Sequence, residues 1–415
     1  MFMRGQFKTS LACVAAVSLL LAACGSDDAA SETSDAPVES TAESTDDPVD
    51  TTAESGGGDG VAAAQARVDE FSQTLTEIGI TDTVAVPADL EVFYAQCPVP
   101  VCEQIAQGLQ KAVDAVGGTL TIQAYDGSPE GTQAAFQSGV QAAPDIFMSS
   151  GNPVEWYEQE LVEFEALGIP VVQWSIPGGL VPDGMTANLI TGGDYYFQGA
   201  LIADWIVAET GGEANVLAMN MGGTFPVLGL EQQGFENQMA EVCPDCKLNV
   251  QEISLDQLLA GEHISVAISE FQKDPEINYI FTGFGDMLIG LHEALADNGL
   301  AEGVPSASQA GTTANYQLIA DGKQAIDIGL PSEFLAYRAL DAGLRALAGQ
   351  DIGQVDARPL TDVAGASDTP GAEDILIAGL PVQILTADTV GDPTTPWAGI
   401  EGFQDQFLAL WETGS

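Results

Sequence analysis

One carboxylate in this chain stands where it could bind the hydroxyl groups of a small molecule. Asp286 lies just beyond the apolar run Tyr279 to Thr282, at the carboxyl end of an expected strand. A carboxylate there can accept two hydrogen bonds from adjacent hydroxyls, and such charge-assisted bonds are the strong ones. The alternative is that Asp286 caps a helix beginning at Met287, because Asp is a favoured N-cap residue. The two roles can coexist.

Aromatic and amide side chains stand at the ends of other expected strands. Ring faces can cover the apolar surface of a sugar ring, with core packing as the alternative for each ring. Amides supply hydrogen-bond donors and acceptors. The ring candidates are Trp174, Phe225 and Phe284, with Tyr94 and Tyr125 weaker, and the amide candidates are Gln96, Asn152, Asn220 and Gln309.

Two close cysteine pairs fall in the part of the chain expected to fold. They are Cys97 with Cys102 and Cys243 with Cys246. In an exported protein such pairs are most simply two short-range disulfides. The rival is a four-thiolate zinc site, because Cys243-Pro-Asp-Cys246 has the spacing of a metal knuckle. The pairs fall in different halves of the architecture inferred below, which favours the disulfides.

Residues suited to catalysis are scarce. The only two histidines, His263 and His292, suggest neither a metal cluster nor a Ser-His-Asp triad. Gly283-Phe-Gly285 has two glycines of a dinucleotide-binding loop, but Leu288 occupies the position of the third. We therefore expect a protein that is not an enzyme and that uses no cofactor and no metal.

The charge balance restricts both the ligand and the partners. The formal net charge is −51, with 61 acidic residues against 10 basic ones. Such a chain is a poor partner for nucleic acid or anionic lipid, and its self-repulsion indicates a saline or an acidic habitat. A phosphorylated or carboxylate ligand would lack its usual counter-charge. A neutral polyol or sugar fits, and so does a small cation held by Asp286 and ring faces.

The first residues have the pattern of a secretion signal. Arg4 and Lys8 precede an apolar stretch, Leu11 to Ala23, that is too short for a hydrocarbon core needing about 20 helical residues. The stretch ends in Leu21-Ala-Ala-Cys24, which resembles the bacterial lipobox. We expect residues 1–23 to be a lipoprotein signal peptide and Cys24 to carry a lipid. The protein would then be exported and held at the outer face of the cell membrane through this anchor only.

A low-hydrophobicity stretch follows the expected anchor. Residues 24–60 are rich in Ser, Thr, Asp, Glu, Pro and Gly, and Val38 and Val49 are their only large aliphatic side chains. Such a segment cannot bury enough apolar area to offset its ordering entropy. We predict a disordered acidic tether over 24–60, followed by an N-terminal extension over 61–87.

From Leu90 onward, short apolar runs alternate with amphipathic stretches of helical length. This pattern predicts parallel sheets covered by helices on both faces. About 330 residues exceed what one core usually spans, so we predict an α/β fold with two doubly wound Rossmann-like lobes. Ligands of such sheets bind at the carboxyl ends of the strands, which places the pocket between the lobes. The expected helices include Glu103 to Val116, Leu228 to Val242 and Met287 to Asn298.

Several local patterns lie in the same order in one known family. The run Tyr279-Ile-Phe-Thr-Gly-Phe-Gly-Asp286 is similar to a family strand followed by Asn-Asp, and Gly168-Ile-Pro-Val-Val172 matches an Ile-Pro-Val strand. The Gly322-Lys323 turn also fits, and Phe407 to Trp411 is similar to a short terminal helix. From Leu90 on, the chain thus resembles the type I periplasmic binding proteins, the ribose-binding-like receptors of ABC transporters.

The resemblance implies how the chain is divided and what it contacts. It implies a three-segment hinge between the lobes, a sugar gripped by Asp286, a monomer, and an ABC transporter permease as partner. The chain departs from the family where Cys97 to Cys102 replaces a stacking pair of aromatics and Ser175-Ile176 replaces Asp-Arg, which argues against ribose. The implied divisions are 88–192 plus 331–372 for the N-terminal lobe, 193–330 plus 373–395 for the C-terminal lobe, and 396–415 for a C-terminal helix.

The leading functional hypothesis is capture of a neutral carbohydrate or polyol and its delivery to a permease. One alternative is a sensory receptor that presents its bound signal to a membrane kinase or chemoreceptor. A second is binding of a small amine. An enzyme on the same framework is the weakest alternative, because the chain offers so little catalytic chemistry.

Overall fold

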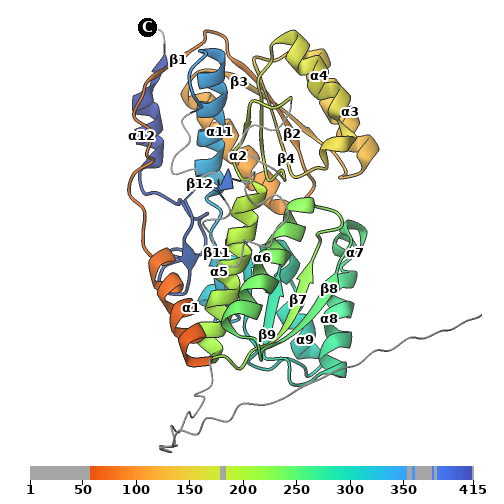
Figure 1. Ribbon diagram of the computed structural model, residues 1–415. Coiled ribbons are helices and arrows are strands. Elements are labelled where there is room, and N and C mark those ends of the chain that lie inside the picture. The colour runs from red at the N-terminus through yellow and green to blue at the C-terminus, as the bar shows by residue number, and fades with distance from the viewer. Residues whose placement is uncertain (1–56, 178–183, 353–357, 360–375, 378–380, 414–415) are drawn as a thin grey trace, which may run out of the picture. The chain divides into compact units, whose positions relative to one another are not determined.

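The computed structural model describes residues 57–177, 184–352, 358–359, 376–377 and 381–413 (Figure 1). Cys24, the expected signal peptide and most of the expected tether lie outside these residues. Within the described part, no helix has both the length and the apolar character that crossing a bilayer requires. The predicted two-lobed α/β architecture is confirmed, with one mainly parallel sheet in each lobe.

The first lobe is built on a five-stranded parallel sheet in the order β3-β2-β4-β5-β6. Helices α2 and α11 pack on one face of this sheet, and α3 and α4 pack on the other (Figure 1). The strands are β2 (Glu91–Gln96), β3 (Thr119–Ala124), β4 (Ile146–Ser150), β5 (Val171–Trp174) and β6 (Ala187–Asn188). The helices are α2 (Pro100–Ala115), α3 (Pro129–Ala142), the 3-10 turn η1 (Val154–Trp156), α4 (Glu158–Leu167) and α11 (Ser332–Leu347).

The second lobe is built on a six-stranded sheet in the order β14-β11-β10-β9-β7-β8, of which only β14 is antiparallel to its neighbour. Its strands are β7 (Asn215–Asn220), β8 (Lys247–Glu252), β9 (Tyr279–Thr282), β10 (Ser306–Gln309), β11 (Gln324–Ile328) and β14 (Ile384–Leu385). Its helices are α5 (Gly192–Thr210), α6 (Pro226–Val242), α7 (Leu255–Leu259), α8 (Glu262–Lys273), α9 (Leu291–Asp297) and α10 (Thr313–Ala320). A separate short pair joins β12 (Arg358–Pro359) to β13 (Leu376–Ile377).

Local sequence explains where the helices begin. Thr191 and Asp194 form a capping box at the start of α5, which satisfies backbone N–H groups that have no partner inside the helix. Pro100 and Pro226 stand at the first helical positions of α2 and α6, where proline loses no hydrogen bond. These two helices therefore begin three and two residues earlier than the apolar periodicity predicts.

The chain passes between the lobes more often than a three-segment hinge requires. Helix α1 (Gly57–Phe71) packs against α5 and α6 of the second lobe, whereas the next element, β1 (Val84–Val86), packs against α11 of the first. At the other end, β14 belongs to the second lobe, and α12 (Phe403–Leu410) packs on α11. Strand β15 (Trp411–Thr413) then pairs in parallel with β1. The two ends of the described chain thus add two further connections, which lie side by side (Figure 1).

Three predicted boundaries are wrong. Helix α1 begins at Gly57, so the last four residues of the expected disordered tether are helical, because they continue a helix that is packed on the second lobe. The terminal helix is shorter than 396–415, and Trp411 belongs to β15. The expected helix from Met287 to Asn298 is interrupted: the 3-10 turn η2 (Gly285–Leu288) is followed by Gly290 with φ 77°, and only then by α9. Gly290, whose backbone is left-handed, separates the 3-10 turn η2 from helix α9.

Candidate functional site

The candidate site lies where both sheets reverse their strand order. In the first lobe β2 has β3 on one side and β4 on the other, and in the second lobe β7 has β8 on one side and β9 on the other. Open α/β sheets bind ligands outside the carboxyl ends of the strands at such reversal points. A pocket of about 80 Å³ is lined by residues that follow β2 and β4 in one lobe and β7 and β9 in the other.

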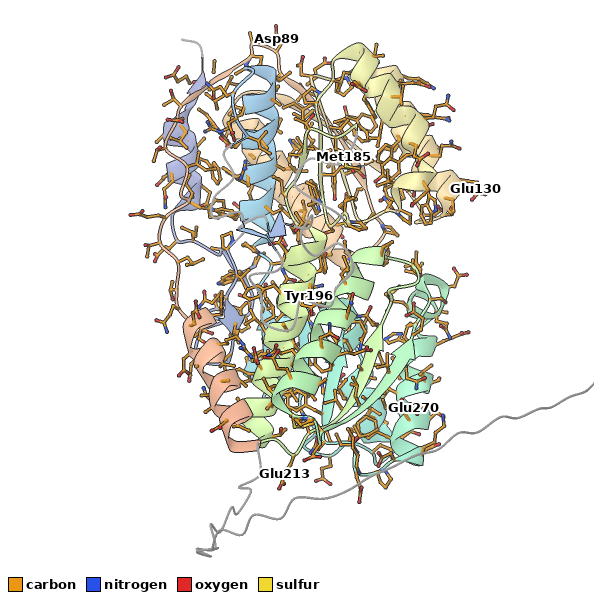
Figure 2. The ribbon with its side chains drawn as sticks, in the orientation of Figure 1. Asp89, Glu130, Met185, Tyr196, Glu213 and Glu270 are labelled. Carbon is orange, nitrogen blue, oxygen red and sulfur yellow. A yellow bond between two sulfur atoms is a disulfide. The ribbon has the colours of Figure 1, made fainter. Side chains whose placement is uncertain are left out.

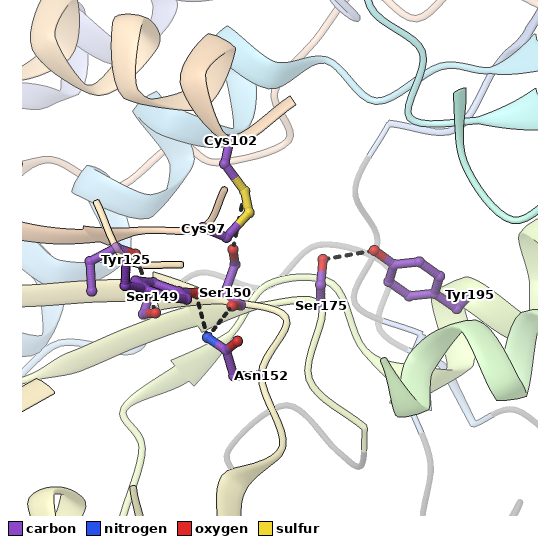
Figure 3. Close-up of a disulfide and its surroundings, with 9 residues drawn as sticks. Cys97, Cys102, Tyr125, Ser149, Ser150, Asn152, Ser175 and Tyr195 are labelled. Atoms are coloured by element: carbon purple, nitrogen blue, oxygen red, sulfur yellow. Dashed lines mark hydrogen bonds between the residues drawn. A yellow bond between two sulfur atoms is a disulfide. The ribbon is translucent and has the colours of Figure 1, made fainter. Parts of the chain in front are cut away.

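The first lobe contributes a disulfide, a helix start and a strand end. Cys97 and Cys102 are bonded to each other and both line the pocket (Figure 3). Val101, in the first turn of α2, lines it beside them, as does the indole of Trp174 at the end of β5. Trp174 is 1% exposed, and its ring stacks on that of Tyr94 with the centroids 5.6 Å apart. The stacked Tyr94 ring therefore fixes the orientation of the indole.

The second lobe contributes two rings and the start of α6. Phe225 precedes α6, Val227 and Leu228 lie in its first turn, and Phe284 follows β9. Gln309, at the end of β10, donates from Nε2 to the carbonyl oxygen of Gly283 at 2.7 Å. None of the described lining residues carries a formal charge.

Backbone conformation is unusual at two lining positions. Ser175 has φ 61° and Ala310 has φ 51°, in the left-handed region that residues other than glycine rarely adopt. Both follow directly on strands that end at the pocket. Tyr195, near the start of α5, donates its hydroxyl to Ser175 Oγ at 2.8 Å (Figure 3), which holds the first of these residues in place.

The pocket brings together half of the residues predicted to bind ligand. Trp174, Phe225, Phe284 and Gln309 line it. The other four predicted ligand-binding residues do not belong to the described lining: Asp286, Gln96, Asn152 and Asn220. Asn152 is instead buried and donates Nδ2 to the Tyr125 hydroxyl and to Ser150 O (Figure 3). Asn220 is also buried, and its Nδ2 donates to Glu231 Oε2 at 3.2 Å. Both amides therefore hold their own lobe together.

Gln96 and Asp286 lie close to the pocket without lining it. Gln96 ends β2 directly before Cys97 and is half-buried. Asp286 is 9% exposed and lies between strand β9 and helix α9, next to Phe284 and near Val101 of the other lobe. Neither of its carboxylate oxygens makes a well-formed hydrogen bond, although the backbone N–H of Val101 lies close enough to interact with the carboxylate. The expected alternative, a cap on a helix starting at Met287, is wrong, because α9 begins at Leu291.

Burial dominates the electrostatics around Asp286. Loss of water raises the pKa of Asp286 to about 7, the backbone N–H of Val101 lowers it, and the charge of Asp327 raises it. Burial also raises the pKa of Asp327 to about 7, although Ser308 and Gly311 donate hydrogen bonds to its carboxylate. Burial likewise holds the pKa of Glu231 well above its usual range. Burial therefore favours the neutral form of each of these three acids.

The second cysteine pair lies away from the pocket. Cys243 and Cys246 form a disulfide at the end of α6, and both sulfurs lie near the carbonyl oxygen of Gly212. The loop between Cys243 and Cys246 lies at the end of the second lobe on which α1 packs.

The acidic side chains of the surface do not belong to the described pocket lining. Exposed carboxylates such as Glu130 and Glu213 lie on the outside of the two lobes (Figure 2).

Sequence reasoning missed the apolar half of the pocket. Val101, Val227 and Leu228 were inside or before expected helices and looked like ordinary core residues. The signal that could have found them is the pair of prolines, Pro100 and Pro226, because a proline at the first helical position marks a helix start and parallel sheets direct those starts toward the site.

Comparison with known proteins identifies the family. The family model described as the periplasmic binding protein domain matches residues 90–351, which is more than half of the chain. The chain belongs to this family. Periplasmic binding proteins bind solutes outside the cytoplasm and are not enzymes, which agrees with the scarcity of catalytic residues in the sequence. Among curated protein sequences, none matches the chain.

Solved structures share the fold of this periplasmic binding protein at low identity. The sugar ABC transporter substrate-binding protein of Bordetella parapertussis is 15% identical, with TM-score 0.61, over 78% of this chain and 96% of that chain. The solute-binding protein of Actinobacillus succinogenes with bound D-allose is 15% identical, with TM-score 0.59, over 72% and 99%. That of Agrobacterium vitis with bound allitol is 18% identical, with TM-score 0.59, over 74% and 98%.

Proposed function

We propose that this periplasmic binding protein captures a small uncharged solute in the pocket between its lobes and delivers it to an ABC transporter permease. The observation that carries the proposal is the pocket itself, which lies at the strand-order reversal of both sheets and whose described lining has no charged side chain. Neutral carbohydrates and polyols are the first candidate ligands, because the similar structures from Actinobacillus succinogenes and Agrobacterium vitis hold D-allose and allitol.

A neutral ligand fits better than a small amine. A buried ammonium needs a carboxylate or several oxygen acceptors to offset its lost hydration. The described lining carries no carboxylate, and burial raises the pKa of Asp286, beside Phe284, to about 7, which disfavours its charged form. A protonated or half-protonated carboxyl is suited to exchanging hydrogen bonds with a hydroxyl group. We therefore place Asp286 at the edge of the site as the partner of one ligand hydroxyl.

Binding in this pocket couples to the separation of the lobes. Residues of both lobes line it, so a ligand makes its full set of contacts only when the lobes are closed, and it shifts the population toward that state. A permease can then distinguish the loaded closed form from the empty one. Cys24 fixes the protein to the outer face of the membrane, which keeps the loaded form near the permease.

The binding step is tested with the purified chain. Native mass spectrometry identifies any small molecule that co-purifies, and a thermal-shift screen of sugars, polyols and amines covers the case in which none does. For the ligand so found, we expect Phe284→Leu to weaken binding by at least about tenfold, since it removes a ring from the pocket wall. The matched control is Phe271→Leu, which alters a buried ring that does not line the pocket. Equal affinities for the two variants would place the site elsewhere.

The delivery step is tested in cells. Deleting the gene should abolish uptake of the radiolabelled ligand while leaving uptake of an unrelated solute unchanged. A deletion that leaves uptake intact but abolishes a transcriptional or motility response to the ligand would instead support the sensory alternative. Growth with a radiolabelled fatty acid should label the parent chain and leave a Cys24→Ser chain unlabelled, and equal labelling of the two would contradict lipidation at Cys24.

A further inference from the structure

The pocket offers few hydrogen-bonding groups for its size. Of the 17 described lining residues, only Ser150, Ser175, Tyr195 and Gln309 carry a hydroxyl or an amide side chain, and Trp174 adds one indole N–H donor. The remaining surface is made of aliphatic side chains, aromatic rings, a glycine and the disulfide between Cys97 and Cys102. Most ligand sites are largely apolar, but a site for a sugar must also match each buried hydroxyl.

The polar groups that are present already have partners within the protein. Tyr195 donates its hydroxyl to Ser175 Oγ at 2.8 Å, and Gln309 donates to Gly283 O at 2.7 Å. Ser150 Oγ faces the Cys102 sulfur at 3.8 Å. These bonds set the orientation of the groups, and each leaves room for at most one or two further bonds to a ligand.

A fully hydroxylated ligand would be poorly matched to this lining. Each hydroxyl that leaves water without finding a partner in the pocket weakens binding. A hydrocarbon surface gains from the same burial, because it leaves water for a wall of rings and aliphatic groups. The balance between the two effects therefore shifts toward ligands with few hydroxyl groups.

We propose that the pocket selects a neutral ring compound with a hydrocarbon body and one or two hydroxyl groups over a fully hydroxylated sugar or polyol. This inference rests on the proposed capture of a small uncharged solute, and within that class it ranks sparsely hydroxylated rings ahead of the carbohydrates and polyols named first above. The pocket volume of about 80 Å³ holds on the order of six water molecules, which leaves room for one six-membered ring. The body of the ring meets Phe225, Phe284 and Val227, and its hydroxyl meets the Ser175 and Tyr195 pair or Asp286 at the edge.

The experiment compares ligands that share one carbon ring and differ in hydroxyl number. Cyclohexanol, trans-1,2-cyclohexanediol and myo-inositol are titrated into the purified chain by calorimetry. We expect cyclohexanol or the diol to bind at least about tenfold more tightly than myo-inositol. Binding of myo-inositol as tight as or tighter than the other two overturns the inference and leaves the proposed function standing. Failure of all three to bind also overturns it, and the proposed function is then judged by the co-purifying ligand alone.

A conservative variant tests whether the lining causes the preference. Val227→Thr replaces one methyl of a pocket residue by a hydroxyl at nearly constant volume, and Val227 is 2% exposed. We expect it to reduce the ratio of cyclohexanol to inositol affinity by at least about fivefold. Val216→Thr makes the same change in β7, at a buried position that does not line the pocket, and should leave the ratio unchanged. An unchanged ratio in a folded Val227→Thr variant contradicts the inference.

Discussion

Arg67 of α1 and Asp204 of α5 form an ion pair in which Nε and Nη2 of the guanidinium donate to the two oxygens of one carboxylate. Asp204 is fully buried, and Gln238 of α6 donates to the same carboxylate at 2.7 Å. The pair therefore joins three helices at one point. Because α1 is the first described element of the chain, the pair fixes the N-terminal extension to the second lobe.

Removing one partner of this pair should destabilise the protein strongly. Arg67→Ala leaves a buried carboxylate with only Gln238 as partner, and we expect a loss of about 3 kcal/mol in the free energy of unfolding. Urea denaturation followed by circular dichroism measures it. The control is the double variant Arg67→Met with Asp204→Leu, which removes both charges and should be closer to the parent. A single variant within about 1 kcal/mol of the parent would contradict the structural role of the pair.

The buried acids of the second lobe predict greater stability in mild acid. A folded-state pKa of about 7 for Asp327 means that the folded protein holds a proton that the unfolded chain has lost above pH 3.8. Stability from this group is therefore lost as pH rises from about 4 to 7, at up to about 1.4 kcal/mol for each unit of pKa shift. Asp286 acts in the same direction.

The contribution of Asp327 is isolated by comparing one variant at two pH values. Asp327→Asn cannot ionise, so its unfolding free energy relative to the parent should be more favourable at pH 7.5 than at pH 5, by more than about 1 kcal/mol. The difference between variant and parent cancels the groups whose pKa is lowered, such as Glu270 and Asp274. A difference that does not change with pH would mean that Asp327 ionises normally.

The two disulfides should differ in their effect on ligand binding. Removing Cys97–Cys102 by a double change to Ser frees the loop that lines the pocket, and we expect weaker binding together with a stability loss of about 2 kcal/mol. The Cys243–Cys246 disulfide closes a similarly short loop that does not line the pocket, so removing it in the same way should affect stability alone. Calorimetry with the identified ligand separates the two effects. Equal affinities in both double variants would show that the first disulfide has no part in the site.

The sequence was a good guide to the lobes because their pattern is repeated and strong. The strand Tyr279 to Thr282 is a run of mostly apolar residues, and its predicted limits agree with the structure. Glycines at positive φ were harder to interpret. Gly290 looks like an ordinary helix residue beside His292 and Leu291, but its left-handed backbone separates η2 from α9.

The site was only half predictable, for a physical reason. Position at a strand end is local information, and Trp174 and Phe284, which were chosen on it as ligand-binding candidates, line the pocket. Whether a side chain there turns toward the pocket or into its own lobe depends on contacts between segments far apart in the chain. Asn220 was selected on the same grounds, yet it turns toward Glu231 because that buried acid needs a donor. Periodicity does not encode such a pairing.

The crossing of α5 and α6 should be intolerant of even one added methyl group. A Cβ at Gly199 would overlap the backbone of Glu231, and a Cβ at Gly234 would overlap the backbone of Tyr196, so each helix lies against a glycine of the other. Gly234→Ala should therefore lower the free energy of unfolding by at least about 2 kcal/mol, although alanine favours a helix by up to about 1 kcal/mol. Gly229→Ala on the same helix is the matched control, because its nearest neighbour is 3.7 Å away. That variant should be neutral or stabilised, and similar stabilities for the two alanine variants would mean that the helices do not cross as closely as the structure shows.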